Sequence, residues 1–93
     1  MAPPNIVLFC VDQWRGDCLG IDGHAVVSTP YLDRLALDGV RFSRAYSAVP
    51  SCIAARASLM TGLTPRAHGR VGYRDGVPWN YGVTLAGEFT RHG

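Results

Sequence analysis

The sequence predicts an α/β fold in which helices pack on a mainly parallel central sheet, and three observations lead to this prediction. Residues 5–11 form a continuous apolar run rich in β-branched and aromatic residues, which is typical of a strand buried on both faces. Segments 29–39 and 84–93 combine residues that start helices with apolar positions at helical spacing. Loops rich in glycine and proline separate these elements, as the alternation of strands and helices requires.

The elements of the first half follow one another with clear boundaries. Residues 14–28 contain three glycines and are expected to form a loop after the first strand. A helix is then expected to begin at Thr29-Pro30, in the usual order of N-cap and first-turn proline, and to end at Gly39. Alternating apolar residues over 40–46 indicate a second short strand.

Residues 50–62, Pro-Ser-Cys-Ile-Ala-Ala-Arg-Ala-Ser-Leu-Met-Thr-Gly, are the most informative part of the chain. Ser51 is suited to the N-cap of a short helix, and Gly62 to the left-handed residue that ends it. Cys52 then lies at the helix N-terminus, with Arg56 one turn further on the same side. Because a helix N-terminus presents unpaired N–H groups and partial positive charge, this corner is suited to binding an anion.

Other interpretations of the cysteines are less consistent with their spacing. Cys10 and Cys18 are expected to act as small hydrophobic residues. A Cys-x5-Arg phosphatase loop is excluded, because only three residues separate Cys52 from Arg56. No pair of cysteines has the short spacing of a zinc site, and three scattered cysteines do not form a disulfide framework.

A second candidate site follows the first predicted strand. Asp12 and Gln13 come directly after residues 5–11, and ligands of open α/β sheets bind beyond the carboxyl ends of the strands. A carboxylate and an amide carbonyl are oxygen ligands suited to a hard divalent cation. Considered alone, Asp12 is equally consistent with capping the next turn.

The last third of the chain is expected to be a long ordered loop, 63–82, followed by an amphipathic helix from Thr84 to His92. His68 is interpreted as a residue that stabilises this loop, in preference to a proton donor. Trp79 and Tyr81 are compatible with lining a substrate cleft, although aromatic residues in loops more often anchor the loop itself.

Composition limits the classes of function. Ninety-three residues make at most one small domain, and 47% hydrophobic with 17% charged residues is typical of a globular chain. The net charge of +2 is too small to indicate binding to nucleic acid or to an acidic membrane. No basic, apolar and small-residue pattern of a secretory signal is visible, so a cytoplasmic location is expected.

Five residues of the 50–62 segment match a known pattern, Cys-x-Pro/Ala-x-Arg followed by Thr-Gly: Cys52, Ala54, Arg56, Thr61 and Gly62. This segment resembles the modification and active-site motif of the sulfatase family. The opening strand with its acid–amide pair, the helix after Thr29 and the approach over 40–46 are also similar to that family. The resemblance therefore covers nearly the whole chain.

The resemblance implies a formylglycine-dependent sulfatase of the alkaline phosphatase superfamily, with an α/β/α sandwich fold. Cys52 would be converted by a formylglycine-generating enzyme, and the hydrated aldehyde would be the nucleophile that attacks a small-molecule sulfate ester. Arg56 would stabilise that nucleophile and the metal site. Asp12, Gln13 and residue 52 would hold a divalent metal, calcium being expected and magnesium or manganese being the alternatives.

The resemblance also implies that residues 1–93 are an N-terminal fragment of a longer catalytic domain. The chain has no lysine, and the family uses one to bind the sulfate group, so we expect the 93 residues to be inactive alone. Two other functions stay open. Phosphonate monoester and phosphodiester hydrolases share the fold and the formylglycine, and a non-catalytic domain of this fold would keep Cys52 as a thiol.

Overall fold

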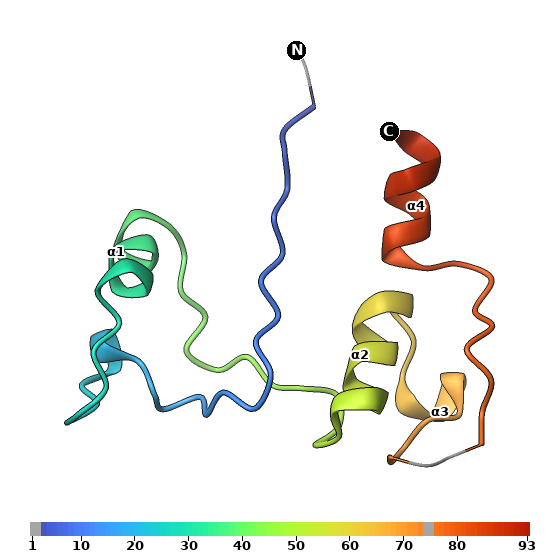
Figure 1. Cartoon of the computed structure of the whole chain (residues 1–93), viewed down its shortest axis with the longest axis horizontal. Helices are drawn as coiled ribbons and strands as arrows, with labels where there is room; N and C mark the ends of the chain where they lie inside the picture. Colours follow the sequence, from blue (N-terminus) through green and yellow to red (C-terminus); the bar gives the residue numbers. More distant parts are fainter. Residues whose placement is uncertain (1–2, 74–75) are drawn as a thin grey trace. The chain divides into compact units, whose positions relative to one another are not determined.

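The structure is a computed structural model that describes residues 3–73 and 76–93. Its elements, in chain order, are the short 3-10 helix η1 (Gly20–Asp22), α1 (Pro30–Asp38), α2 (Cys52–Thr61), α3 (Pro65–His68) and α4 (Leu85–His92) (Figure 1). They fall into two units, Met1–Ser43 and Arg44–Gly93. Each unit is described by itself below.

In the first unit, η1 packs against α1 through a small polar cluster. The Thr29 hydroxyl accepts the Gly20 N–H at 2.8 Å and donates to Asp33 Oδ1 at 2.8 Å. The same carboxylate oxygen accepts the Ile21 N–H at 2.9 Å. The predicted helix start is confirmed, but the Thr29 side chain ties the preceding turn to α1 and makes no capping hydrogen bond of its own.

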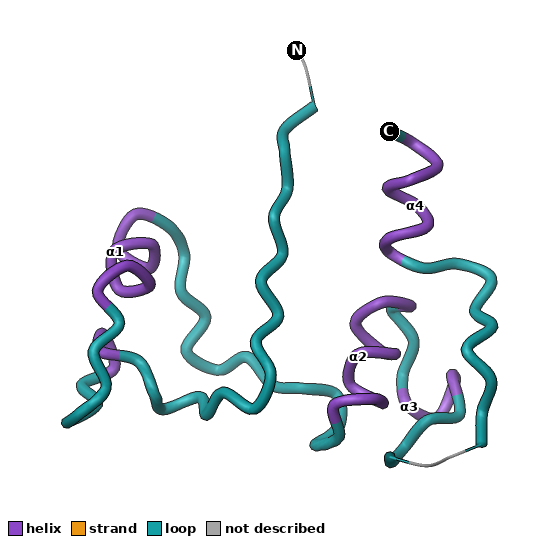
Figure 2. The backbone as a smooth tube through the Cα atoms, in the orientation of Figure 1, coloured by secondary structure: helices purple, strands orange, loops and turns teal. Residues whose placement is uncertain are grey.

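The two predicted strands are not formed in the described part of the chain. Residues 5–11 and 40–46 have no strand assignment, and Figure 2 shows both as loop. A strand exists only when a neighbouring segment accepts and donates its backbone hydrogen bonds, and the described residues supply no such neighbour. Large apolar side chains in both segments are consequently exposed, including Phe9 at 82% and Phe42 at 79%. The parallel sheet therefore stays a prediction.

In the second unit, α2 packs against both α3 and α4. The buried apolar residues of the described chain are Ala54 and Ala57, both 0% exposed and both on α2. Small side chains on the packed side of a helix let neighbouring backbone approach closely, so α2 is the centre of this unit.

The helix boundaries of the second unit agree with the sequence, with one addition. Ser51 has extended backbone at the start of α2, and Gly62 ends it with φ 70°, its N–H donating to the Ser58 carbonyl at 2.8 Å. Thr84 caps α4 by accepting the Gly87 N–H at 3.1 Å. The four-residue helix α3 was expected to be loop, although its Thr-Pro start repeats the signal that predicted α1.

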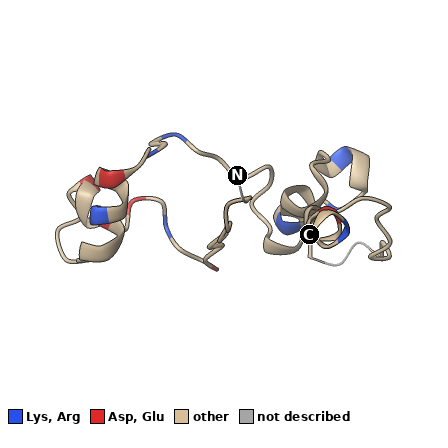
Figure 3. Ribbon diagram, turned by 90° about the horizontal axis from the view of Figure 1, so that it is seen from above, with Lys and Arg blue, Asp and Glu red and all other residues tan. Residues whose placement is uncertain are grey.

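Charged residues of both signs are distributed along the chain (Figure 3). Helix α1, for example, carries Asp33, Arg34 and Asp38. Arg34 and Asp38 form an exposed ion pair at 2.8 Å across one helical turn. None of the helices in the described residues has the length and apolar character needed to cross a membrane.

Candidate active site

Cys52 and Arg56 come from the first two turns of α2. Cys52 is the first residue of the helix and is half-buried, and Arg56 is exposed. With 3.6 residues per turn, positions four apart differ by about 40° around the helix axis, so both side chains leave the helix on nearly the same side. The first hydrogen bond of the helix runs from the Ala55 N–H to the Ser51 carbonyl at 2.8 Å. The amides of residues 52–54 precede that bond and are the donors that a helix N-terminus offers to an anion.

Asp12 and Gln13 are adjacent, exposed residues at the end of the 5–11 segment. Gln13 has φ 50°, the one positive φ among the non-glycine residues that the structure describes. Such backbone is uncommon outside glycine. The side chains of Asp12 and Gln13 offer a carboxylate and an amide oxygen, which are the types of ligand that calcium accepts. The described residues contain no group of three or more His, Cys, Asp or Glu side chains placed to hold a metal, and a metal site at this pair stays a prediction.

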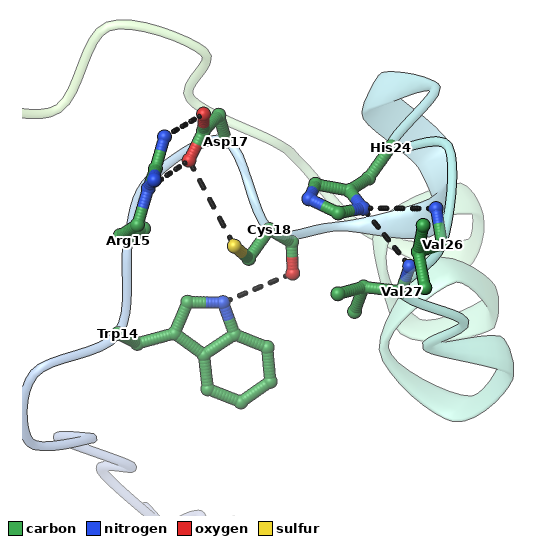
Figure 4. A network of polar contacts seen from close by, with 7 residues as sticks. All are labelled: Trp14, Arg15, Asp17, Cys18, His24, Val26 and Val27. Atoms are coloured by element: carbon green, nitrogen blue, oxygen red, sulfur yellow. Dashed lines mark hydrogen bonds and ion pairs between the residues drawn. The ribbon is translucent and has the colours of Figure 1, made fainter.

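The loop after this pair is ordered by polar contacts, shown in Figure 4. The Trp14 indole N–H donates to the Cys18 carbonyl at 3.0 Å, and Arg15 donates twice to the Asp17 carboxylate, at 2.9 and 2.7 Å. These hydrogen bonds lower the pKa of Asp17 and raise the pKa of Arg15. The His24 Nδ1 accepts two backbone N–H groups from the residues two and three positions later.

His68 lies in the interior of the second unit, where it joins α2 to the following loop. Its side chain is 5% exposed, its Nε2 is 2.8 Å from the Ser58 hydroxyl, and its Nδ1 accepts the Arg70 N–H at 3.1 Å. The prediction that His68 stabilises the loop is confirmed by these contacts. Its link to Ser58 was not predicted, because the sequence does not indicate which face of α2 the loop returns to.

Arg70 is the centre of a second cluster that the sequence did not indicate. It is 5% exposed, its Nε donates to the Tyr81 hydroxyl at 2.7 Å, and its guanidinium carbon lies 4.1 Å from the centre of the Trp79 ring. It also donates to the Val77 carbonyl. The two aromatic residues thus anchor the loop around a buried cation, a role that agrees with the second of their two predicted interpretations.

The predicted site residues fall into the two units. Asp12 and Gln13 belong to the first, and Cys52 and Arg56 to the second. Within the second unit, α2 brings the cysteine and the arginine to one side of the helix. Whether residue 52 shares a metal with the acid–amide pair stays a prediction.

A family model described as Sulfatase matches residues 4–93. The chain is 59% identical over 90 residues to an arylsulfatase of Clostridium perfringens. The aligned residues cover 97% of this chain and 19% of that protein. It is 52% identical over 62 residues to an ulvan-active sulfatase of Formosa agariphila, covering 67% of this chain and 12% of the relative. An N-acetylgalactosamine-6-sulfatase of Mus musculus is 45% identical over 67 residues, covering 72% of this chain and 13% of the relative.

No solved structure matches the chain. The chain spans less than a fifth of the length of each of these three relatives. Sulfatases have an α/β fold, so the predicted fold class agrees with the family, while the sheet itself is not formed by the described residues. The match over residues 4–93 and the identity to the arylsulfatase show that this chain belongs to the sulfatase family.

Proposed function

We propose that the protein hydrolyses sulfate monoesters, and that residue 52 supplies the nucleophile after its thiol is converted to formylglycine. The observation that carries this proposal is the arrangement on α2, where Cys52 is the first helical residue and Arg56 lies one turn away on nearly the same side. The relatives' names, arylsulfatase, ulvan-active sulfatase and N-acetylgalactosamine-6-sulfatase, support a sulfate ester as the substrate class.

The chain's own groups would bind and orient the sulfate at the start of α2. The N–H groups of residues 52–54 would donate to the sulfate oxygens, and the Arg56 guanidinium, one turn further on nearly the same side of the helix, would add positive charge there. Ala54 and Ala57, both fully buried, hold the opposite side of the helix. Formylglycine at position 52 would supply a hydroxyl group of its hydrated aldehyde as the nucleophile.

Asp12 and Gln13 are proposed as two oxygen ligands of a divalent metal, with residue 52 as a third. Calcium is the expected ion because it takes about six to eight oxygen ligands and accepts carbonyl donors, whereas magnesium and manganese are the alternatives. A bound divalent cation would supply Lewis-acid polarisation of the sulfate oxygens. The left-handed backbone of Gln13 supports a functional role, since strained residues persist where a site requires them.

The test uses the full-length protein, produced together with a formylglycine-generating enzyme. Conversion of Cys52 lowers the mass of its peptide by about 18 Da at the residue that would act as nucleophile. Turnover is then compared on an aryl sulfate and an aryl phosphonate monoester. Cys52→Ala is expected to abolish turnover, and the matched control Cys18→Ala, which removes a cysteine that is half-buried like Cys52 but lies outside α2, is expected to leave it unchanged.

Three outcomes would contradict the proposal. An unconverted thiol, under conditions that convert a known substrate of the generating enzyme, would favour a non-catalytic domain. Faster turnover of the phosphonate would favour the phosphonate hydrolase alternative. For the metal, Asp12→Asn is expected to lower the calcium content of the purified protein, and an unchanged content would exclude Asp12 as a ligand.

A further inference from the structure

The helix α2 has a packed side and an open side. With about 100° between successive residues, the buried positions Ala54 and Ala57 lie close together around the axis, with Ser58 beside them. Arg56 differs from Ser58 by roughly 160° around the axis. Ser58 differs from Cys52 by roughly 120° around the axis, so its hydroxyl group lies on a different side of the helix from the two proposed catalytic residues.

The hydrogen bond that reaches this packed side has a defined direction. The His68 Nδ1 accepts the Arg70 N–H at 3.1 Å, so a neutral imidazole carries its proton on Nε2. That Nε2–H then donates to the Ser58 hydroxyl at 2.8 Å. Because His68 and Arg70 are each only 5% exposed, water competes little for these bonds.

The two ends of this connection are themselves held in place. The Ser58 carbonyl accepts the Gly62 N–H at 2.8 Å, which closes the last turn of α2 at the same residue. On the other side, Arg70 is fixed by the Tyr81 hydroxyl and by the Trp79 ring. Ser58 is therefore the residue of α2 that is bonded to His68, the last residue of α3, and His68 is bonded in turn to Arg70.

We propose that His68 is a positioning residue: through Ser58 it fixes the rotation of α2 about its own axis and thereby the direction of residue 52 and Arg56. This inference rests on the proposed function. A rotation of about 10° moves an atom roughly 6 Å from the helix axis by about 1 Å. A displacement of that size is enough to cost up to about a hundredfold in rate when it misplaces reacting groups.

Three variants of the converted full-length protein test the proposal. His68→Gln keeps an amide N–H near the position of Nε2 and is expected to retain the bond to Ser58. His68→Asn can accept the Arg70 N–H but is too short to reach Ser58, and Ser58→Ala removes the bond from the other side. We expect the Asn and Ala variants to lower kcat by roughly tenfold to a hundredfold with a smaller change in KM, and His68→Gln to stay near the wild-type rate.

The control and the double variant separate positioning from general loss of stability. Thr90→Ala also deletes one hydroxyl hydrogen bond from a helix of the same unit, to the Ala86 carbonyl on α4, and is expected to leave kcat unchanged. If His68 acts through Ser58, the double variant Ser58→Ala/His68→Asn is no slower than the slower of its two parents.

The outcomes distinguish failure of this inference from failure of the proposed function. Wild-type protein that is converted yet cleaves no sulfate ester overturns the proposed function, and the positioning role with it. Active wild-type protein with unchanged kcat in Ser58→Ala overturns the positioning role alone. Equal losses in His68→Gln and His68→Asn, with additive effects in the double variant, show that His68 only stabilises the loop.

Discussion

Replacement of Gly20 by alanine tests the polar cluster that joins η1 to α1. A Cβ atom at this position would lie 2.5 Å from Asp33 Oδ2, which is too close for any contact, so the carboxylate must move. The other oxygen of that carboxylate accepts hydrogen bonds from the Ile21 N–H and the Thr29 hydroxyl. Moving the side chain therefore weakens two charge-assisted hydrogen bonds at once.

The magnitude follows from these contacts. A hydrogen bond to a charged group contributes about 1.5–3 kcal/mol, and the half-buried carboxylate is displaced without losing both bonds completely. Alanine also restricts the unfolded chain, which offsets about 0.4–1 kcal/mol. We expect Gly20→Ala to lower the free energy of unfolding by about 1–2 kcal/mol. Gly16→Ala is the matched control, because a Cβ atom there meets nothing within 4 Å and the backbone φ is not positive.

The assay is urea unfolding of the full-length protein, together with hydrogen exchange at the Ile21 amide, which reports the cluster directly. The decisive comparison repeats Gly20→Ala in an Asp33→Ala background, where the side chain that would clash is absent. There the substitution is expected to be neutral or slightly stabilising. An equal loss of stability in both backgrounds would refute the steric argument and place the cost in the backbone.

Three further predictions concern other parts of the chain. Gly62→Ala should lower the free energy of unfolding by about 1 kcal/mol in urea unfolding, because φ is 70° there although the space around it is open. Gly82, whose surroundings are also open, has no positive φ, so an equal effect of Gly82→Ala would contradict this reason. Arg15→Gln should return the lowered pKa of Asp17 to its ordinary range in an NMR titration. Because the folded-state pKa of Asp17 is lowered, its carboxylate contributes stability above its ordinary pKa and loses that contribution as pH falls through the lowered value. An unchanged Asp17 titration in Arg15→Gln would rule Arg15 out as the cause. Arg56→Lys should lower kcat despite retaining the charge, since an ammonium group does not reproduce a guanidinium fork, and a wild-type rate would show that the fork is not needed.

Local signals in the sequence were sufficient to place α1, α2 and α4, whereas the short helices η1 and α3 lie in segments that were expected to be loops. Thr29-Pro30 and Gly39 border α1, and Ser51 and the left-handed Gly62 border α2, although neither Thr29 nor Ser51 makes a side-chain capping hydrogen bond. A first-turn proline and a left-handed glycine act over about one turn of chain, so the sequence can indicate them. The same local reasoning put Cys52 at a helix N-terminus with Arg56 one turn away. The family was also evident from the sequence, since its motif depends on residue types and spacing within a single helix.

The two strands were predicted from the composition of their own segments, and composition does not show which other segment would pair with them. Residues 5–11 have the apolar, β-branched character of a buried strand, yet a strand is a relation between two segments. Among the described residues no segment pairs with them, and their side chains are exposed. The strand propensity of this segment is a property of its own residues, whereas a sheet also needs a partner segment, which the composition of residues 5–11 does not specify.

The sequence by itself determined the boundaries of α1, α2 and α4, the sulfatase motif and the side of α2 that carries Cys52 and Arg56, because each depends on neighbours within about one helical turn. Only the tertiary structure decided that Ser58 meets His68 and that Arg70 is enclosed by aromatic residues of a distant loop segment. Those partners are nine to eleven residues apart. Which residues meet is set by how α3 packs on α2 and by the side chains that reach Arg70, and no local pattern specifies either of these.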